Sequence, residues 1–104
     1  MDICVNLSLD ETVDLLEKQI LSSSRAKLID KYIVDGAYVI VFNKYFLRVN
    51  ANASLTLTIH FNGECTIVHP VAAGGHYGLA ENDFGAGDKF TSDVEKILEQ
   101  YLIK

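Results

Sequence analysis

Residues 28–42 read LIDKYIVDGAYVIVF, two apolar stretches on either side of the dipeptide Asp35-Gly36. An Asp-Gly dipeptide tolerates the positive φ angles of a type I′ turn, which joins two antiparallel strands. The dipeptide Asn62-Gly63 stands in the same way between the strand-like stretches 54–61 and 64–71. Two successive hairpins predict an antiparallel sheet.

Between these hairpins, residues 37–50 can form one strand or two. A turn at Asn43-Lys44 would divide them, but we favour one long, bent strand. The polar and small residues Asn50–Ala53 then indicate a loop before the next strand.

Two helices flank this sheet in the sequence. Ser8 precedes Glu11 by three residues, a capping-box spacing, and apolar residues follow with helical periodicity at Leu9, Val13, Leu16 and Ile20. The triple serine 22–24 should end this helix. A second capping box, Ser92 with Glu95, predicts a helix over residues 92–102, with an apolar stripe at Val94, Ile97, Leu98, Tyr101 and Leu102.

The alternating residues Ile3, Val5 and Leu7 add a short first strand, so the element order is strand, helix, four strands, helix. This order predicts a single α+β domain over residues 1–104, with about five antiparallel strands and both helices on one face. The TATA-binding-protein-like topology and the smaller helix-grip folds share this order. That analogy concerns the fold and carries no function.

Composition narrows the class of protein. The chain has 104 residues, 49% of them apolar, and a net charge of −5, which suits one folded domain. It has neither an apolar run of membrane-spanning length nor a signal-peptide pattern at its start, so we predict a cytoplasmic protein without a membrane partner. The two cysteines form neither a disulfide framework nor a C-x-x-C site, and we expect Cys4 to be a small buried hydrophobe.

Charge is unevenly distributed along the chain. Residues 25–50 carry five basic against two acidic side chains, a net of +3. With Tyr32, Tyr38, Tyr45 and Phe46 nearby, this segment allows a nucleic-acid-binding sheet as an alternative. The sequence pI near 5.0 argues against it, because the field of an acidic chain repels nucleic acid and anionic membranes.

The first hairpin is apolar on both faces. Alternation places Ile29, Ile33, Tyr38, Ile40 and Phe42 on one side, and Leu28, Tyr32, Val34, Val39 and Val41 on the other. A second copy of the chain, an apolar ligand or residues 72–90 must cover the excess surface. Because subunit contact is the commonest cover for such patches, we predict a homodimer.

A two-residue turn at Asn62-Gly63 would place His60 opposite Cys65 on the neighbouring strand. Such a pair could be a nucleophile with its base, or half of a metal site. However, His69 would lie too far away to complete a zinc site, and a catalytic cysteine usually lies at a loop or helix N-terminus. We therefore favour ordinary half-exposed sheet residues, and assign no catalytic and no metal-ligating residue.

Residues 72–90 contain five of the seven glycines and can form either a long loop or an extra edge strand near residues 76–80 followed by a turn. Loops of this length often bind ligands or partners. The polar candidates are His76, Tyr77, Asp83, Asp88 and Lys89. The segment matches neither a phosphate-binding P-loop nor a Rossmann fingerprint, so we predict no cofactor.

These observations favour a non-enzymatic binding or homo-oligomeric module, with a small-molecule or partner site near residues 72–90. The alternative from another class is a small hydrolase-like enzyme, using His60 with Cys65 or His76 with Asp83.

Three motifs carry a resemblance to a known family. Residues 53–59 read ASLTLTI, Gly74-Gly75 follow, and residues 83–87 read DFGAG with Phe90 close behind. Together they resemble a family of small bacterial proteins of unknown function. The resemblance implies a bacterial, cytosolic origin and supplies no catalytic residues.

Overall fold

The computed structural model describes residues 2–23, 26–46, 51–74 and 86–103. The predicted element order is confirmed in this part of the chain. The elements are β1 (Ile3–Val5), α1 (Leu9–Ser23), β2 (Lys27–Val34), β3 (Ala37–Phe46), β4 (Ala51–Phe61), β5 (Thr66–Gly74), α2 (Ala86–Leu98) and a short 3₁₀ helix, η2 (Glu99–Tyr101).

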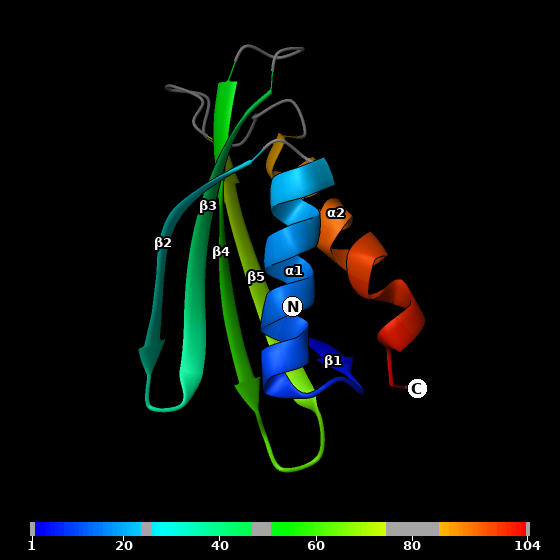
Figure 1. Cartoon of the computed structure of the whole chain (residues 1–104). Helices are drawn as coiled ribbons and strands as arrows, with labels where there is room; N and C mark the ends of the chain where they lie inside the picture. Colours follow the sequence, from blue (N-terminus) through cyan, green and yellow to red (C-terminus); the bar gives the residue numbers. More distant parts are fainter. Residues whose placement is uncertain (1, 24–25, 47–50, 75–85, 104) are drawn as a thin grey trace.

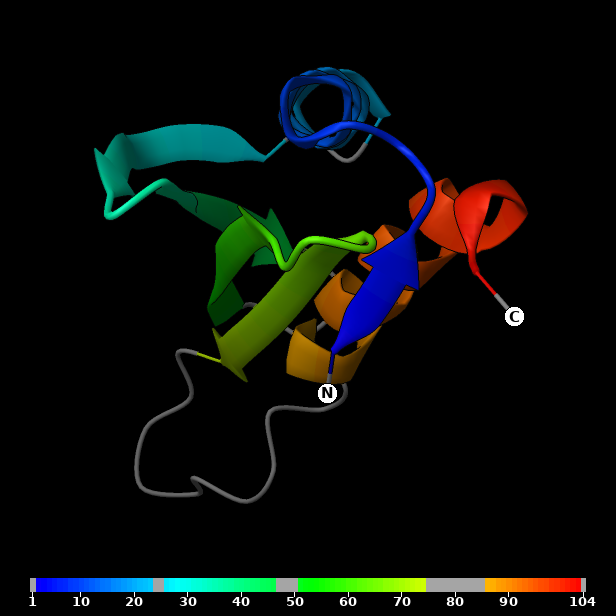
Figure 2. The same cartoon turned by 90° about the horizontal axis from the view of Figure 1, so that it is seen from below.

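The five strands form one antiparallel sheet in the order β1-β5-β4-β3-β2. Both helices lie on the same side of this sheet (Figures 1 and 2). α2 packs on β4 and β5, and α1 packs on β4 and on α2. The α+β class and its two-layer arrangement are therefore as predicted.

The core lies between the sheet and the helices. α1 buries Val13, Leu16 and Ile20, the positions that its periodicity indicated. The sheet and α2 complete the core with Ile40, Phe42, Leu55, Leu57, Ile59, Val68, Phe90, Val94 and Leu98.

The predicted capping box fixes the start of α1. The backbone N–H of Ser8 donates to Glu11 Oε1 at 3.0 Å, and the N–H of Glu11 donates to Ser8 Oγ at 3.1 Å. Each side chain thus satisfies a backbone N–H that has no partner within the helix.

The first hairpin has the predicted two-residue turn. Asp35 and Gly36 have φ angles of 48° and 79°, and Val34 pairs with Ala37 across them. One detail of the face assignment is wrong. A register irregularity between Leu28 and Asp30 pairs Leu28 with Phe42, so Leu28 lies on the helix-covered side and not with Tyr32.

The second hairpin differs from the prediction. Phe61 pairs with Thr66, so the loop has four residues, 62–65, in place of two. The Asn62 side chain accepts hydrogen bonds from the N–H groups of Glu64 and Cys65, both at 2.9 Å. This side-chain turn competes with the tight turn and lengthens the loop. The register moves by two, which keeps the same faces but places His60 opposite Ile67.

The preference for one continuous strand at Asn43-Lys44 is confirmed. These residues stay in β3, paired with Ser54 and Ala53 of β4. The predicted loop at 50–53 is wrong for residues 51–53, which belong to β4, because pairing with β3 extends that strand. Residue 50 lies outside the described residues.

α2 begins six residues earlier than predicted, at Ala86 instead of Ser92. Ser92 and Glu95 therefore lie inside the helix and do not cap it. Phe90, which is fully buried, extends the apolar stripe by one turn towards the N-terminus and holds the added residues on the sheet. The regular α-helix ends at Leu98, and η2 carries the chain to Tyr101.

Candidate functional site

The edge strand β2 is the most exposed element of the described structure. All eight of its residues are exposed, and within the described residues it pairs only with β3. Five large apolar side chains contribute to this surface: Leu28, Ile29, Tyr32, Ile33 and Val34. A long apolar edge strand is a template for pairing with another chain.

The apolar residues of β2 reach both sides of the sheet. Tyr32 and Val34 pair with Val39 and Ala37 and lie on the side without helices, which we call the open face. Ile33 pairs with Tyr38 and lies on the helix side. It is nevertheless 59% exposed, because the helices pack mainly on β4 and β5. The prediction of a hairpin with two apolar faces is confirmed.

Polar contacts join the hairpin to α1. Lys31 Nζ lies 2.6 Å from Glu17 Oε1 and 6.0 Å from the centre of the Tyr38 ring. The Tyr38 hydroxyl donates to Asp10 Oδ1 at 3.4 Å. A cavity of about 460 Å³ lies at this junction, lined by Asp10, Glu11, Val13, Asp14, Lys31 and Tyr38.

The ion pair of Lys31 should make the stability of the folded protein depend on pH in the alkaline range. The hydrogen bond to Glu17 is the main cause that raises the pKa of Lys31 above its usual 10.5; desolvation opposes the shift, while the charge of Glu17 adds to it. The contribution of a raised pKa is fully present below the unfolded value and disappears as pH rises through the folded value.

We therefore expect the melting temperatures of wild type and Lys31→Gln to differ below about pH 10 and to converge above the raised pKa. Thermal melts between pH 8 and 12 measure this difference. Lys18→Gln, which removes a more exposed ion pair with Asp14, is the matched control. A constant gap across this pH range would contradict the expectation.

The open face continues across β3, β4 and β5. Pairing places apolar, hydroxyl and imidazole side chains on it: Val39, Val41, Tyr45, Thr56, Thr58, His60, Ile67, His69 and Val71. No helix in the described part of the chain covers this side (Figure 2). Near β1, His69 Nδ1 lies 2.6 Å from Asp2 Oδ1.

The opposite edge of the sheet is closed. β1 has only three residues, and the C-terminal segment lies along its outer side. Val5 forms a bridge with Leu102, and the N–H of Ile103 donates to the Cys4 carbonyl at 3.0 Å. The N–H of Asn6 donates to the Tyr101 carbonyl, also at 3.0 Å. Within the described residues, the sheet thus has one protected edge, at β1, and one open edge, at β2.

Cys4 and Cys65 form a disulfide, which the sequence reasoning missed. Their Cα atoms are 5.9 Å apart, and the bond joins β1 to the loop before β5. The interpretation of Cys4 as an isolated buried hydrophobe is therefore wrong. Cys65, in turn, is neither opposite His60 nor a free thiol.

The feature that indicates the disulfide is the pairing register of β1 with β5. Cys4 pairs with Ile67, so Cys65 is its diagonal neighbour on the same face. A four-residue loop at Asn62 places Cys65 there, whereas the assumed two-residue turn directed it towards His60.

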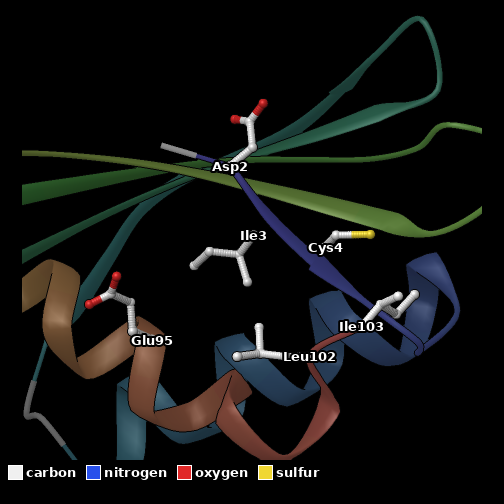
Figure 3. A pocket seen from close by; sticks show the side chains of 6 residues that line it. All are labelled: Asp2, Ile3, Cys4, Glu95, Leu102 and Ile103. Atoms are coloured by element: carbon white, nitrogen blue, oxygen red, sulfur yellow. The ribbon is translucent and has the colours of Figure 1, made fainter.

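A second cavity, of about 370 Å³, lies beside this disulfide (Figure 3). It is lined by Asp2, Ile3, Cys4, Glu95, Leu102 and Ile103. In Figure 3, Ile3 and Leu102 face the space between β1 and the C-terminal segment, and the Asp2 carboxylate extends to the other side of β1. Among the residues described, no group of three or more His, Cys, Asp or Glu side chains is placed to hold a metal ion.

The structure does not bring the predicted ligand-binding residues together in the described region. His76, Tyr77 and Asp83 lie outside the described residues, and with them the alternative pair His76 and Asp83. The predicted loop bounds are wrong at both ends, because residues 72–74 belong to β5 and residues 86–90 to α2. Asp88 and Lys89 therefore lie in the first turn of α2. The ligand site near residues 72–90 stays a prediction.

Among the described residues of segment 25–50, the basic and aromatic side chains are divided between the two sides of the sheet. Tyr32 and Tyr45 lie on the open face, whereas Tyr38 lies on the helix side. Lys31 is paired with Glu17, and Lys44 Nζ lies 4.0 Å from Asp93 on α2. The side chain of Phe46 is outside the described part. Of the described basic residues, Lys27 alone shares the open face with Tyr32 and Tyr45. One basic group beside two rings weakens the nucleic-acid alternative, since basic groups and stacking rings need to share a face.

Fold and surface together define a small α+β protein whose antiparallel sheet carries helices on one side and keeps one edge strand exposed. The chain belongs to a family of unknown function (DUF6054), whose sequence model matches residues 2–102. No curated protein and no solved structure gives a significant match. In the described residues, no helix combines the length and the apolar character needed to cross a membrane.

Proposed function

We propose that this protein is a non-enzymatic module that forms a homodimer through the β2–β3 hairpin, residues 27–46. The observation that carries the proposal is the exposure of apolar side chains on both faces of β2. Ile29 is 60% exposed, Ile33 59% and Val34 53%. A contact that buried them would remove this surface from water, which stabilises association by about 25 cal/mol per Å² before the costs of association.

Charge supports a second copy as the partner. The chain is acidic, with a net charge of −5, and its helical surface carries acids such as Asp10, Glu11 and Asp14. β2 itself carries Lys27 and Lys31 against Asp30. Two hairpins can therefore approach each other with less like-charge repulsion than two helical surfaces can.

Substitution in β2 should dissociate the dimer. We expect wild type to be dimeric and Ile33→Ser to raise the dimer dissociation constant about tenfold or more, because the lost apolar contact occurs once in each copy. Light scattering after size exclusion, over a range of concentrations, measures the constant. Phe61→Ser is the matched control, since Phe61 is 55% exposed but lies at the other hairpin. A monomeric wild type at all concentrations would refute the proposal.

We also propose a small-molecule site near residues 72–90. Native mass spectrometry of the same sample tests it. A non-covalent mass retained by the protein would support a ligand site near residues 72–90, and its value would define the ligand's class. A mass equal to two chains alone would favour the dimer contact without a ligand.

We also propose that the protein is bacterial and cytoplasmic. The Cys4–Cys65 disulfide bears on the proposed location. Disulfides persist in oxidising compartments and are rare in the cytoplasm. Alkylation of thiols in intact cells before lysis measures whether the bond is present where the protein resides. A fully oxidised pair would count against the cytoplasmic location.

A further inference from the structure

We infer that β2 pairs antiparallel with β2 of a second copy, around a two-fold axis through Tyr32, so that the two five-stranded sheets become one continuous sheet. This inference rests on the proposed homodimer and specifies its contact: backbone pairing at the edge, in place of packing of one face on another. The backbone of β2, its bulge and its charges each constrain the pairing.

The turn determines which backbone groups point outward. Asp35 and Gly36 form a two-residue turn, and the flanking pair Val34 and Ala37 then exchanges both backbone hydrogen bonds. Alternation gives Tyr32 the same inward direction. The N–H and C=O groups of Lys31 and Ile33 therefore point away from β3, towards the open edge. There the Lys31 N–H donates to Asp30 Oδ1 at 2.9 Å, an exposed local bond that pairing with another strand would replace.

The bulge sets the length of the usable edge. The register irregularity between Leu28 and Asp30 interrupts the regular spacing of β2 near its start. The regular part of the strand is therefore residues 30–34, with Tyr32 at its centre. Pairing about Tyr32 uses all of this part, whereas an axis at Ile33 or Val34 would extend the contact into the turn.

Charge selects the same register. Antiparallel strands related by a two-fold axis keep equivalent faces on the same side, and the residue on the axis lies opposite its own copy. An axis at Asp30 or Lys31 would oppose like charges, which is destabilising. An axis at Tyr32 opposes two aromatic rings, and each charge then faces an apolar residue of the second copy.

The resulting contact satisfies the outward groups. Lys31 of one copy lies opposite Ile33 of the second copy, and the two-fold axis repeats this pair. Each pair exchanges two backbone hydrogen bonds, and the Lys31 N–H replaces its bond to Asp30 Oδ1 with one to the Ile33 carbonyl of the second copy. On the open face, Asp30 lies opposite Val34 of the second copy, and the Tyr32 rings pack together.

Hydrogen exchange on the wild-type, full-length protein tests this pairing directly. Comparing a concentrated dimer with a dilute, dissociated sample, we expect the amide of Ile33 to exchange more slowly in the dimer, by about tenfold or more. The amide of Lys31, which already donates to Asp30 Oδ1, should slow by less. The amide of Tyr32, which already faces β3, should change less.

Cross-linking gives a second measurement. Under mild oxidation Tyr32→Cys should form mostly covalent dimer, because residues opposite each other have Cβ atoms about 5 Å apart. Val34→Cys is the matched control, on the same strand, same face and similarly exposed, and should form little. A monomeric wild type would defeat the proposed function itself. A dimer without protection at Ile33, and without preference for position 32, would overturn only the edge pairing.

Discussion

Reducing the Cys4–Cys65 disulfide should lower the free energy of unfolding by about 4 kcal/mol at 25 °C. The bond closes a loop between residues separated by 61 positions. On the chain-entropy model, a loop of that length restricts the unfolded chain by roughly this amount. Domains of this size have only about 5–15 kcal/mol of stability in total, so the loss is large.

Urea denaturation with and without a phosphine reductant measures the difference. The double variant Cys4→Ala with Cys65→Ala is the control: it should unfold at a reduced midpoint that the reductant does not change. If wild type keeps the same midpoint when its thiols are shown to be free, the disulfide does not contribute the expected stability.

Replacing Phe42 by alanine should cost about 3–5 kcal/mol. Phe42 is fully buried and pairs with Leu28 of β2 on one side and Leu55 of β4 on the other. The substitution removes an aromatic ring and leaves a cavity that neighbouring strands cannot fill without moving. Because this ring lies next to β2, the hairpin should also become less well ordered.

Phe61→Ala makes the same chemical change at a residue that is 55% exposed, and we expect it to cost less than about 1 kcal/mol. The denaturant midpoints of the two variants measure this difference in cost, provided that their unfolding free energies depend equally steeply on denaturant concentration. Equal costs for both positions would contradict the burial of Phe42.

Local signals made the first half of the fold predictable. The capping box at Ser8 and the apolar periodicity after it determine α1, because both depend on residues within one or two turns. The turn at Asp35-Gly36 is local in the same sense, since positive φ at both positions favours a type I′ turn directly. The two apolar faces of the hairpin could then be predicted, because successive side chains of a strand point to opposite sides of the sheet.

The errors arose where distant contacts decide the structure. Asn62 could form a tight turn or a side-chain turn, and the sequence favoured the first while the structure has the second. The assumed tight turn shifted the predicted pairing of β4 with β5 by two residues. Cys65 was therefore placed opposite His60 and not next to Cys4. The early start of α2 depends on burial of Phe90 against the sheet, a tertiary contact that overrides the capping signal at Ser92. The bulge beside Leu28 has no compositional signature.

The segment that pairs with β1 limits how large an assembly can become. A sheet with two free edges can add copies at both ends without limit, as amyloid-forming strands do. Here Leu102 and Ile103 occupy the outer side of β1, and among the described residues β2 is the edge strand left without a second neighbour. If two copies pair through β2 as proposed, that pairing would use the exposed edge of each copy and the assembly would stop at a closed pair. Leu102 and Ile103 would thus prevent open-ended growth of the sheet into fibres, while β2 stays available for specific pairing.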